Sequence, residues 1–268
     1  MDDPARRYDQ VYPARGVNME GTAVLLPLRP PGYAPRVLIA GGTGATRLNW
    51  NPGESGAMKS AEWIDLSAAA PAWQALPDMN VERGKLNSVL LPDGRVAILG
   101  GWENPPDGGP IEIFDPEDPT AGFQLGPSMK YARGYHSSAI LLPDGSLVMG
   151  GDPGGAWTPN ERYLPSYFFK PRPQITSAPA AISYGQGFSI QTPAPNSIAE
   201  VVLMRPGAVT HGFNQNQRYV GCAITGATAT TLSATAPPDG NVSPPGYHLL
   251  FLVDHDRSPS LGAWIRLS

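Results

Sequence analysis

The stretch "ARGYHSSAILLPDGSLVMGGD", residues 132–152, nearly repeats "ERGKLNSVLLPDGRVAILGGW", residues 82–102. Both stretches contain Arg-Gly, an apolar run, Pro-Asp-Gly and a second apolar run that ends in Gly-Gly. Asp-Gly permits the positive φ angles of a tight hairpin, and a glycine pair lets two backbones approach closely. Each stretch therefore predicts a β-hairpin whose strands are buried on both faces.

The two stretches belong to a repeat with a period of 50 residues, since Arg83 aligns with Arg133. A looser third copy occupies residues 21–44, with a longer loop in place of Pro-Asp-Gly. A strand, a tight turn, a strand ending in Gly-Gly and an aromatic-bearing strand, repeated at this period, are typical of kelch blades in a β-propeller. The sequence therefore predicts kelch-type blades over residues 1–168.

These blades are too few to close a ring. About three precede residue 165, whereas closed propellers carry roughly four to eight. An open propeller exposes unpaired strand edges, which soluble proteins avoid. We therefore expect missing N-terminal blades or a partner chain to close the propeller. Without them the edges near residues 20–40 have nothing to pair with, and we expect the isolated chain to behave poorly in solution.

The composition supports an all-β protein and excludes several classes. Gly and Pro number 31 each, as in proteins with many short strands and turns, and no stretch has a sustained helical period with caps. A net charge of −4 argues against nucleic acid as a partner, and no apolar run is long enough for a membrane span. The N-terminus lacks the apolar core of a signal peptide, so either the protein is cytosolic or its natural beginning is missing.

A second domain begins where the repeat pattern stops. Residues 163–179 form a Pro-rich junction, and after it short apolar runs recur about every ten residues. This spacing predicts an immunoglobulin-like β-sandwich over residues 172–268, although the usual disulfide is missing. We expect the aromatic linker "RYLPSYFFKPRP", residues 162–173, to be largely buried between the two domains.

Tyr135 and His136 mark the difference between the two repeat copies, because the earlier copy has Lys85 and Leu86 there. Successive strand residues point to opposite faces, so a phenol and an imidazole serve one site only where the backbone is irregular, at the mouth of the blade. The alternative is that Tyr135 packs and His136 caps a turn. His211 lies in a polar hairpin tip of the second domain, where the alternative is a solvated loop histidine.

The remaining candidates have simpler interpretations. His248 lies inside an apolar strand and is expected to be structural, while His255 fits an exposed turn. Cys222 is the single cysteine, so it forms no intrachain disulfide, and its strand context is that of a small apolar residue. The sequence has no paired carboxylates at catalytic spacing, phosphate loop, CxxC motif or serine-nucleophile elbow.

Several motifs together resemble the copper radical oxidases, the family of galactose oxidase and glyoxal oxidase. They are "RGYHSSAILLPDGSLVMGG", "VTHGFNQNQR" and "SPPGYHLLFLVD", in the family's order. The resemblance implies that Tyr135, His136 and His211 are copper ligands, with Tyr135 as the axial phenol and the catalytic base. Two imidazoles and oxygen donors suit Cu(II). It also implies that the second domain is the family's early-set immunoglobulin-like domain.

The resemblance further implies an activity. The family oxidises a primary alcohol or aldehyde and reduces O2 to H2O2, so small alcohols, aldehydes or carbohydrates are the expected substrates and a secreted or cell-surface location is expected. The family's radical tyrosine and its cysteine partner lie in earlier blades that this chain does not contain. We therefore expect weak or absent copper binding and no oxidase turnover from this chain alone. The alternative is a non-catalytic kelch plus early-set binding or surface module.

Overall fold

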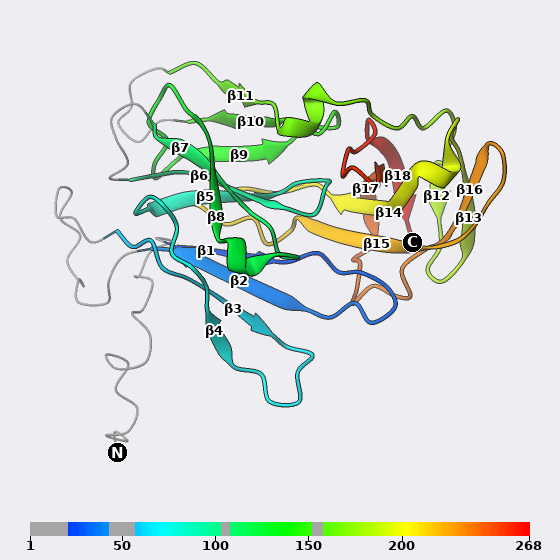
Figure 1. The fold of residues 1–268 in the computed structure, drawn as a ribbon, viewed down its shortest axis with the longest axis horizontal. Coiled ribbons are helices and arrows are strands. Elements are labelled where there is room, and N and C mark those ends of the chain that lie inside the picture. The colour runs from blue at the N-terminus through cyan, green and yellow to red at the C-terminus, as the bar shows by residue number, and fades with distance from the viewer. Residues whose placement is uncertain (1–20, 43–56, 103–107, 152–157) are drawn as a thin grey trace.

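The computed structural model describes residues 21–42, 57–102, 108–151 and 158–268 (Figure 1). Within these ranges the chain forms eighteen β-strands, and its helical structure consists of three 3₁₀ helices of three or four residues. The predicted all-β class is confirmed. No helix in the described ranges is long and apolar enough to cross a membrane.

The first eleven strands form three sheets that lie side by side as blades (Figure 1). The first blade contains β1 (Gly21–Leu25), β2 (Arg36–Gly41), β3 (Ala61–Asp65) and β4 (Trp73–Ala75). The second contains β5 (Gly84–Leu90), β6 (Val96–Trp102), β7 (Pro110–Phe114) and β8 (Phe123–Ser128). The third contains β9 (Ser138–Leu141), β10 (Leu147–Gly150) and β11 (Glu161–Tyr163).

The arginine of each Arg-Gly pair ties together the strands of its own blade. Arg83 donates from Nη1 to the Gly100 carbonyl at 2.7 Å and from Nη2 to the Pro110 carbonyl at 2.5 Å. Its Nη2 also lies 3.2 Å from Glu112 Oε1, and both side chains are fully buried. Arg133 makes the equivalent bonds in the next blade, to Gly151, Pro159 and Glu161. The repeated Arg, Gly-Gly and Glu are therefore parts of one polar network in each of the second and third blades.

The Gly-Gly pair joins each blade to the next one. The Gly101 N–H donates to the Arg133 carbonyl at 2.7 Å, and the Gly42 N–H donates to the Arg83 carbonyl at 2.8 Å. Gly100 has a φ of +67°, and a Cβ there would lie 2.7 Å from the Arg133 carbonyl oxygen. A larger residue would therefore push neighbouring blades apart, which explains why the repeat carries glycine at this point.

The last seven strands form one bent sheet that folds over a separate core. They are β12 (Ala181–Ile182), β13 (Gly187–Gln191), β14 (Ile198–Arg205), β15 (Arg218–Ala227), β16 (Thr231–Thr235), β17 (Gly246–Asp254) and β18 (Ala263–Leu267). The first half of β15 pairs with β14 and its second half with β16, so this strand carries the sheet around the corner. Cys222 lies in the enclosed apolar cluster, as the sequence predicts.

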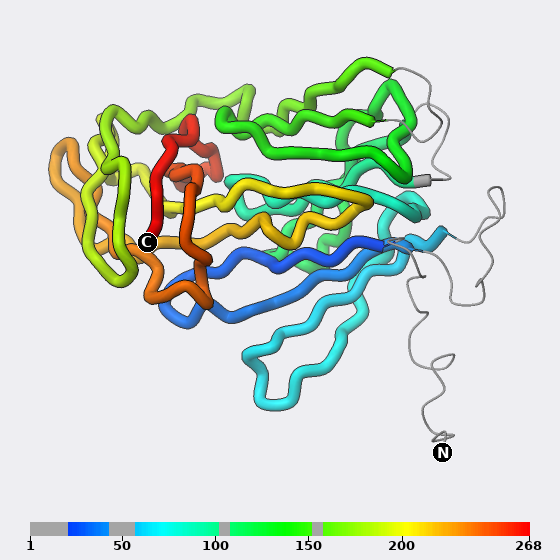
Figure 2. Tube along the Cα trace, turned by 180° about the vertical axis from the view of Figure 1, so that it is seen from behind, coloured from blue at the N-terminus to red at the C-terminus, as the bar shows by residue number. Residues whose placement is uncertain are grey.

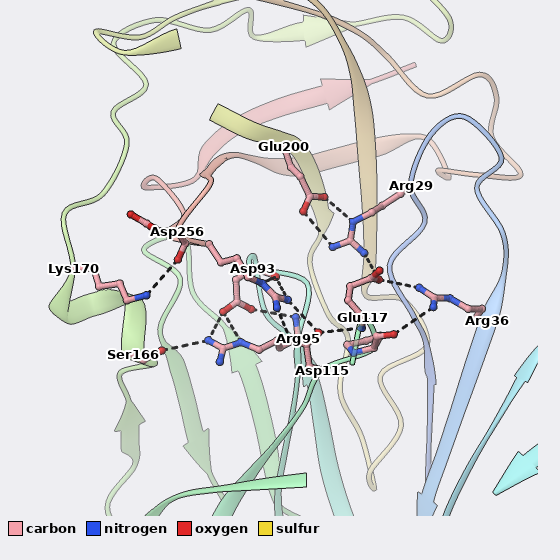
Figure 3. Close-up of polar contacts among 12 residues, drawn as sticks. Arg29, Arg36, Asp93, Arg95, Asp115, Glu117, Ser166, Lys170, Glu200 and Asp256 are labelled. Atoms are coloured by element: carbon pink, nitrogen blue, oxygen red, sulfur yellow. Dashed lines mark hydrogen bonds and ion pairs between the residues drawn. The ribbon is translucent and has the colours of Figure 1, made fainter. Parts of the chain in front are cut away.

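Ion pairs hold this sandwich against the blades (Figure 3). Arg29, from the loop after β1, donates from Nε to Glu200 Oε2 on β14 at 2.8 Å, and the Tyr219 hydroxyl donates to the same oxygen at 2.9 Å. Arg257 pairs with Asp115, which follows β7. One hydrophobic cluster also runs through both parts, including Leu38, Phe114, Val202 and Phe251. The blades and the sandwich therefore share this cluster, in addition to the sandwich's own core.

Two sequence-based expectations need correction. The segment after β1 does find a partner, because the Leu28 N–H donates to the Tyr219 carbonyl at 3.0 Å and the Leu28 carbonyl accepts from the Gly221 N–H at 2.8 Å. The linker is not largely buried: Tyr167 is enclosed, but Phe169 is 78% exposed. Both aromatic side chains lie on one short 3₁₀ turn, Ser166–Phe169, which turns Tyr167 inward and Phe169 to the surface.

His248 predicts a measurable pH dependence of stability. It is buried in β17, where Nδ1 donates to the Gly246 carbonyl and Nε2 accepts from the Ser243 hydroxyl, both at 3.1 Å. Burial, reinforced by the charge of Arg205, lowers the pKa of His248 below its ordinary value of about 6.5. As the pH falls below about 6.5 the unfolded chain therefore binds a proton that the folded chain resists, and stability is lost.

We expect the melting temperature to fall between pH 7 and pH 5, and His248→Gln to flatten that fall. Thermal unfolding followed by circular dichroism measures both. His255→Gln is the matched control, because His255 is exposed. An unchanged slope in His248→Gln would show that other groups cause the pH dependence.

A candidate metal centre between the blades and the sandwich

Tyr135 and His136 occupy a turn immediately before β9. The Ser137 N–H and hydroxyl both donate to the Gly134 carbonyl, at 3.0 and 2.6 Å, so the two aromatic residues are the central pair of a tight turn. The ring centroids of Tyr135 and His136 are 4.3 Å apart. The backbone is therefore irregular where the repeat comparison requires it, and the two rings can face one site.

His211 reaches this turn from the sandwich. The connection from β14 to β15 extends between the first and third blades (Figure 2). At its tip, Thr210 and Phe213 exchange backbone hydrogen bonds of 3.1 and 2.9 Å. The two residues between them, His211 and Gly212, have φ angles of +53° and +81°, as in a type I′ turn. This segment, residues 209–218, is called the finger below.

The finger brings the three predicted residues together. The ring centroid of His211 lies 4.9 Å from that of Tyr135 and 5.0 Å from that of His136. Tyr135 and His211 are half-buried, and His136 is exposed. By contrast, His248 is enclosed in the sandwich and His255 lies at an exposed turn. The structure thus separates the three clustered residues from the other two histidines.

The second nitrogen of His211 has a partner that orients the ring. Thr210 Oγ1 lies 2.6 Å from His211 Nδ1. With the hydroxyl accepting from Nδ1–H, the lone pair of Nε2 is available to a metal. Histidine ligands in metal sites almost always donate their other N–H in this way, which fixes both the tautomer and the ring direction.

Lys85 lies beside the site, and the sequence comparison did not identify it as a neighbour. Its Nζ lies 5.2 Å from the centroid of the Tyr135 ring, and the side chain is only 5% exposed. Its φ of +57° is unusual for a residue other than glycine. Lys85 occupies the repeat position of Tyr135 in the preceding blade. Because equivalent positions of neighbouring blades meet at the mouth, this alignment was itself the signal for the contact.

The donors present suit copper. Two imidazoles and a phenol are the ligand types that Cu(II) accepts, with room for further ligands in a tetragonal arrangement. In the described ranges no three His, Cys, Asp or Glu residues gather at one place, and the ring that lies beside both imidazoles is the phenol of Tyr135. Cys222 cannot contribute, because it is enclosed in the sandwich and burial raises the pKa of its thiol to about 12.

Blades packed against a sandwich that sends one histidine to a Tyr-His turn define a protein of the copper radical oxidase class. The chain belongs to the glyoxal oxidase family. The family model for the glyoxal oxidase N-terminus matches residues 6–166, and that for the galactose oxidase-like early set domain matches residues 172–267. The family resemblance and the early-set assignment of the second domain are thereby confirmed.

Individual relatives agree with this placement. The aldehyde oxidase GLOX1 of Arabidopsis thaliana is 29% identical over 306 residues, which cover 95% of this chain and 48% of that protein. A galactose oxidase of Gibberella zeae is 32% identical over 68% of this chain and 29% of its own length. A fungal alcohol oxidase in complex with copper shares the fold, with a TM-score of 0.77 at 24% identity over 95% of this chain and 56% of its own. The chain thus spans about half the length of GLOX1, or less for the galactose oxidase.

Proposed function

We propose that this chain supplies part of the active site of a copper-dependent oxidase that oxidises a primary alcohol or an aldehyde and reduces O2 to H2O2. The observation that carries the proposal is the gathering of Tyr135, His136 and His211 within 5.0 Å of one another, measured between ring centroids. The relatives named aldehyde oxidase and galactose oxidase support the same reaction type. The proposed domain limits are residues 1–168 for the blades and 172–268 for the sandwich.

In this proposal each residue has a distinct role. His136 and His211 would hold copper through ring nitrogens, and the Tyr135 oxygen would complete the set of protein donors. Copper, when bound, would account for one of the two electrons that alcohol oxidation passes to O2, and the radical tyrosine that the family resemblance implies for the complete protein would account for the other. Tyr135 would accept the hydroxyl proton of the substrate, since a phenolate oxygen beside the substrate is a general base. Thr210 would keep the Nδ1 proton of His211 in place.

The substrate and location follow from the same proposal. A site placed between blades and sandwich, with an exposed imidazole, is open to small alcohols, aldehydes or the primary hydroxyl of a carbohydrate. A secreted or cell-surface location would suit an enzyme that consumes O2 and releases peroxide.

The test uses the full-length gene product, supplied with Cu(II), in a peroxide-release assay with primary alcohols and aldehydes. We expect turnover, and we expect Tyr135→Phe to lower kcat by about 100-fold or more, because the positioned proton acceptor is lost. Tyr131→Phe, four residues earlier in the chain, is the matched control and should keep the activity. A folded, copper-loaded protein that releases no peroxide from any of these substrates would instead favour a non-catalytic binding module.

A further inference from the structure

The finger that carries His211 is fastened to strand β5 by a side-chain amide. Gln217 donates from Nε2 to the Leu90 carbonyl at 3.0 Å and accepts from the Leu90 N–H at Oε1, at 2.9 Å. Strand β5 is the edge of its sheet, so these backbone groups have no neighbouring strand to pair with. Gln217 is only 4% exposed. The Gln217 amide therefore satisfies the N–H and the carbonyl of Leu90, which a neighbouring strand would otherwise do.

Two further contacts fasten the finger along the same strand. Asn214 donates from Nδ2 to Gln217 Oε1 at 2.9 Å and lies 3.3 Å from the Ser88 carbonyl. At the tip, a Cβ on Gly212 would lie 2.6 Å from the Leu86 carbonyl oxygen, so the backbones touch there. The contacted residues of β5 are Leu86, Ser88 and Leu90, which are every second residue. The finger thus follows the edge of the strand from its middle to its end.

The same strand also holds the turn that carries His136. Asn87 donates from Nδ2 to Ser137 Oγ at 2.9 Å, and Ser137 follows His136 directly. Both side chains are almost completely buried. Strand β5 is therefore hydrogen-bonded to each of the two segments that present an imidazole, although those segments come from different domains.

We infer that Gln217, supported by Asn214, is a positioning residue that holds His211 at the metal centre by locking the finger to strand β5. This inference rests on the proposed copper site. His211 has a positive φ, a conformation that persists in non-glycine residues only when the surroundings fix it. Without the Gln217 amide, the finger loses both of its bonds to the Leu90 backbone. It keeps its tip turn, the bond from Asn214 to the Ser88 carbonyl and a 3.4 Å bond from the Thr22 hydroxyl to the Gly212 carbonyl.

The first experiment measures Cu(II) affinity of this chain by competition titration and the Cu(II) EPR spectrum. Gln217→Met keeps the length of the side chain and removes both hydrogen bonds. We expect it to weaken copper binding by about 10- to 100-fold, the usual effect of losing a group that orients a metal ligand. Gln191→Met, a half-buried glutamine on β13 bonded to Thr231, is the matched control and should bind copper as the wild type does.

A double variant separates positioning from general damage. If Gln217 acts through His211, then His211→Ala with Gln217→Met binds copper as weakly as His211→Ala alone, and no more weakly. If the fold-losses of copper affinity multiply in the double variant, the inference is overturned. It is also overturned if Gln217→Met has wild-type copper affinity and an unchanged EPR spectrum. If Gln217→Met does not fold, Asn214→Ala replaces it. That variant removes the bonds of Asn214 to Gln217 and to the Ser88 carbonyl but keeps both bonds between Gln217 and Leu90, so a smaller loss of copper affinity is expected.

Hydrogen exchange of the metal-free chain keeps the test independent of the proposed function. Peptides covering residues 209–218 should exchange faster in Gln217→Met than in the wild type, while peptides from β13 should not change. Unchanged exchange in the finger overturns the inference even if copper binds. If the full-length gene product binds no copper, the proposed function fails, and exchange still decides whether Gln217 locks the finger.

Discussion

Arg83→Met is expected to lower the free energy of unfolding by about 3–5 kcal/mol, the usual cost of removing one partner of a buried ion pair. Arg83 and Glu112 have no exposed side-chain surface, so the substitution leaves the Glu112 carboxylate in the interior without its cation. It also leaves the Gly100 and Pro110 carbonyls without their donor. The measurement is urea unfolding followed by tryptophan fluorescence, with the slope checked for two-state behaviour.

Two companions test the reason for this loss. Arg83→Met with Glu112→Gln should recover part of the stability, because no uncompensated charge is then buried. Arg162→Met removes the cation of a pair with Asp144 that is 51% and 32% exposed, and should cost less than about 1 kcal/mol. A loss below about 1 kcal/mol in Arg83→Met itself would contradict a structural role for the arginine of the repeat.

The repeat made the blades predictable because each of its residues has a contact inside one blade or with the next blade. Arg83, the glycine pair and the turn glycine each recur about 50 residues later. Comparison of the two copies therefore shows which residues the blade structure requires. The exposure of Phe169 was not predictable in the same way. It depends on how one short 3₁₀ turn outside the repeat packs against the third blade, where the Tyr167 hydroxyl donates to the Gly145 carbonyl.

The residues of the candidate site also differ in whether the sequence could predict them. Tyr135 and His136 stood out because the other copy lacks them. His211 is 75 residues beyond His136, and nothing in its local pattern distinguishes an inserted finger from a solvated tip; the family motif pointed to it. The contact of Lys85 with Tyr135 was implied by the repeat alignment but not drawn from it. The bonds of Gln217 join two domains, and only the folded chain brings such residues together.

His211→Ala is expected to weaken Cu(II) binding to this chain by about 100-fold or more. Loss of a residue that merely orients a ligand costs about 10- to 100-fold, and this substitution removes one of the two imidazoles of the proposed site. The remaining pair, His136 and Tyr135, comes from a single turn and offers one imidazole and one phenol. Competition titration with a chelator of known affinity measures the loss, and EPR hyperfine structure reports the change in nitrogen ligation.

His255→Ala is the control for this substitution, because it also removes one histidine from the chain but from an exposed turn. Its copper affinity should equal that of the wild type, while His136→Ala should resemble His211→Ala. Since the two imidazoles would bind one ion, the double variant should fall to the level of adventitious binding and should lose the nitrogen hyperfine lines. Equal affinity of wild type and His211→Ala would remove the finger from the metal centre, and with it the contact between domains on which the proposed oxidase depends.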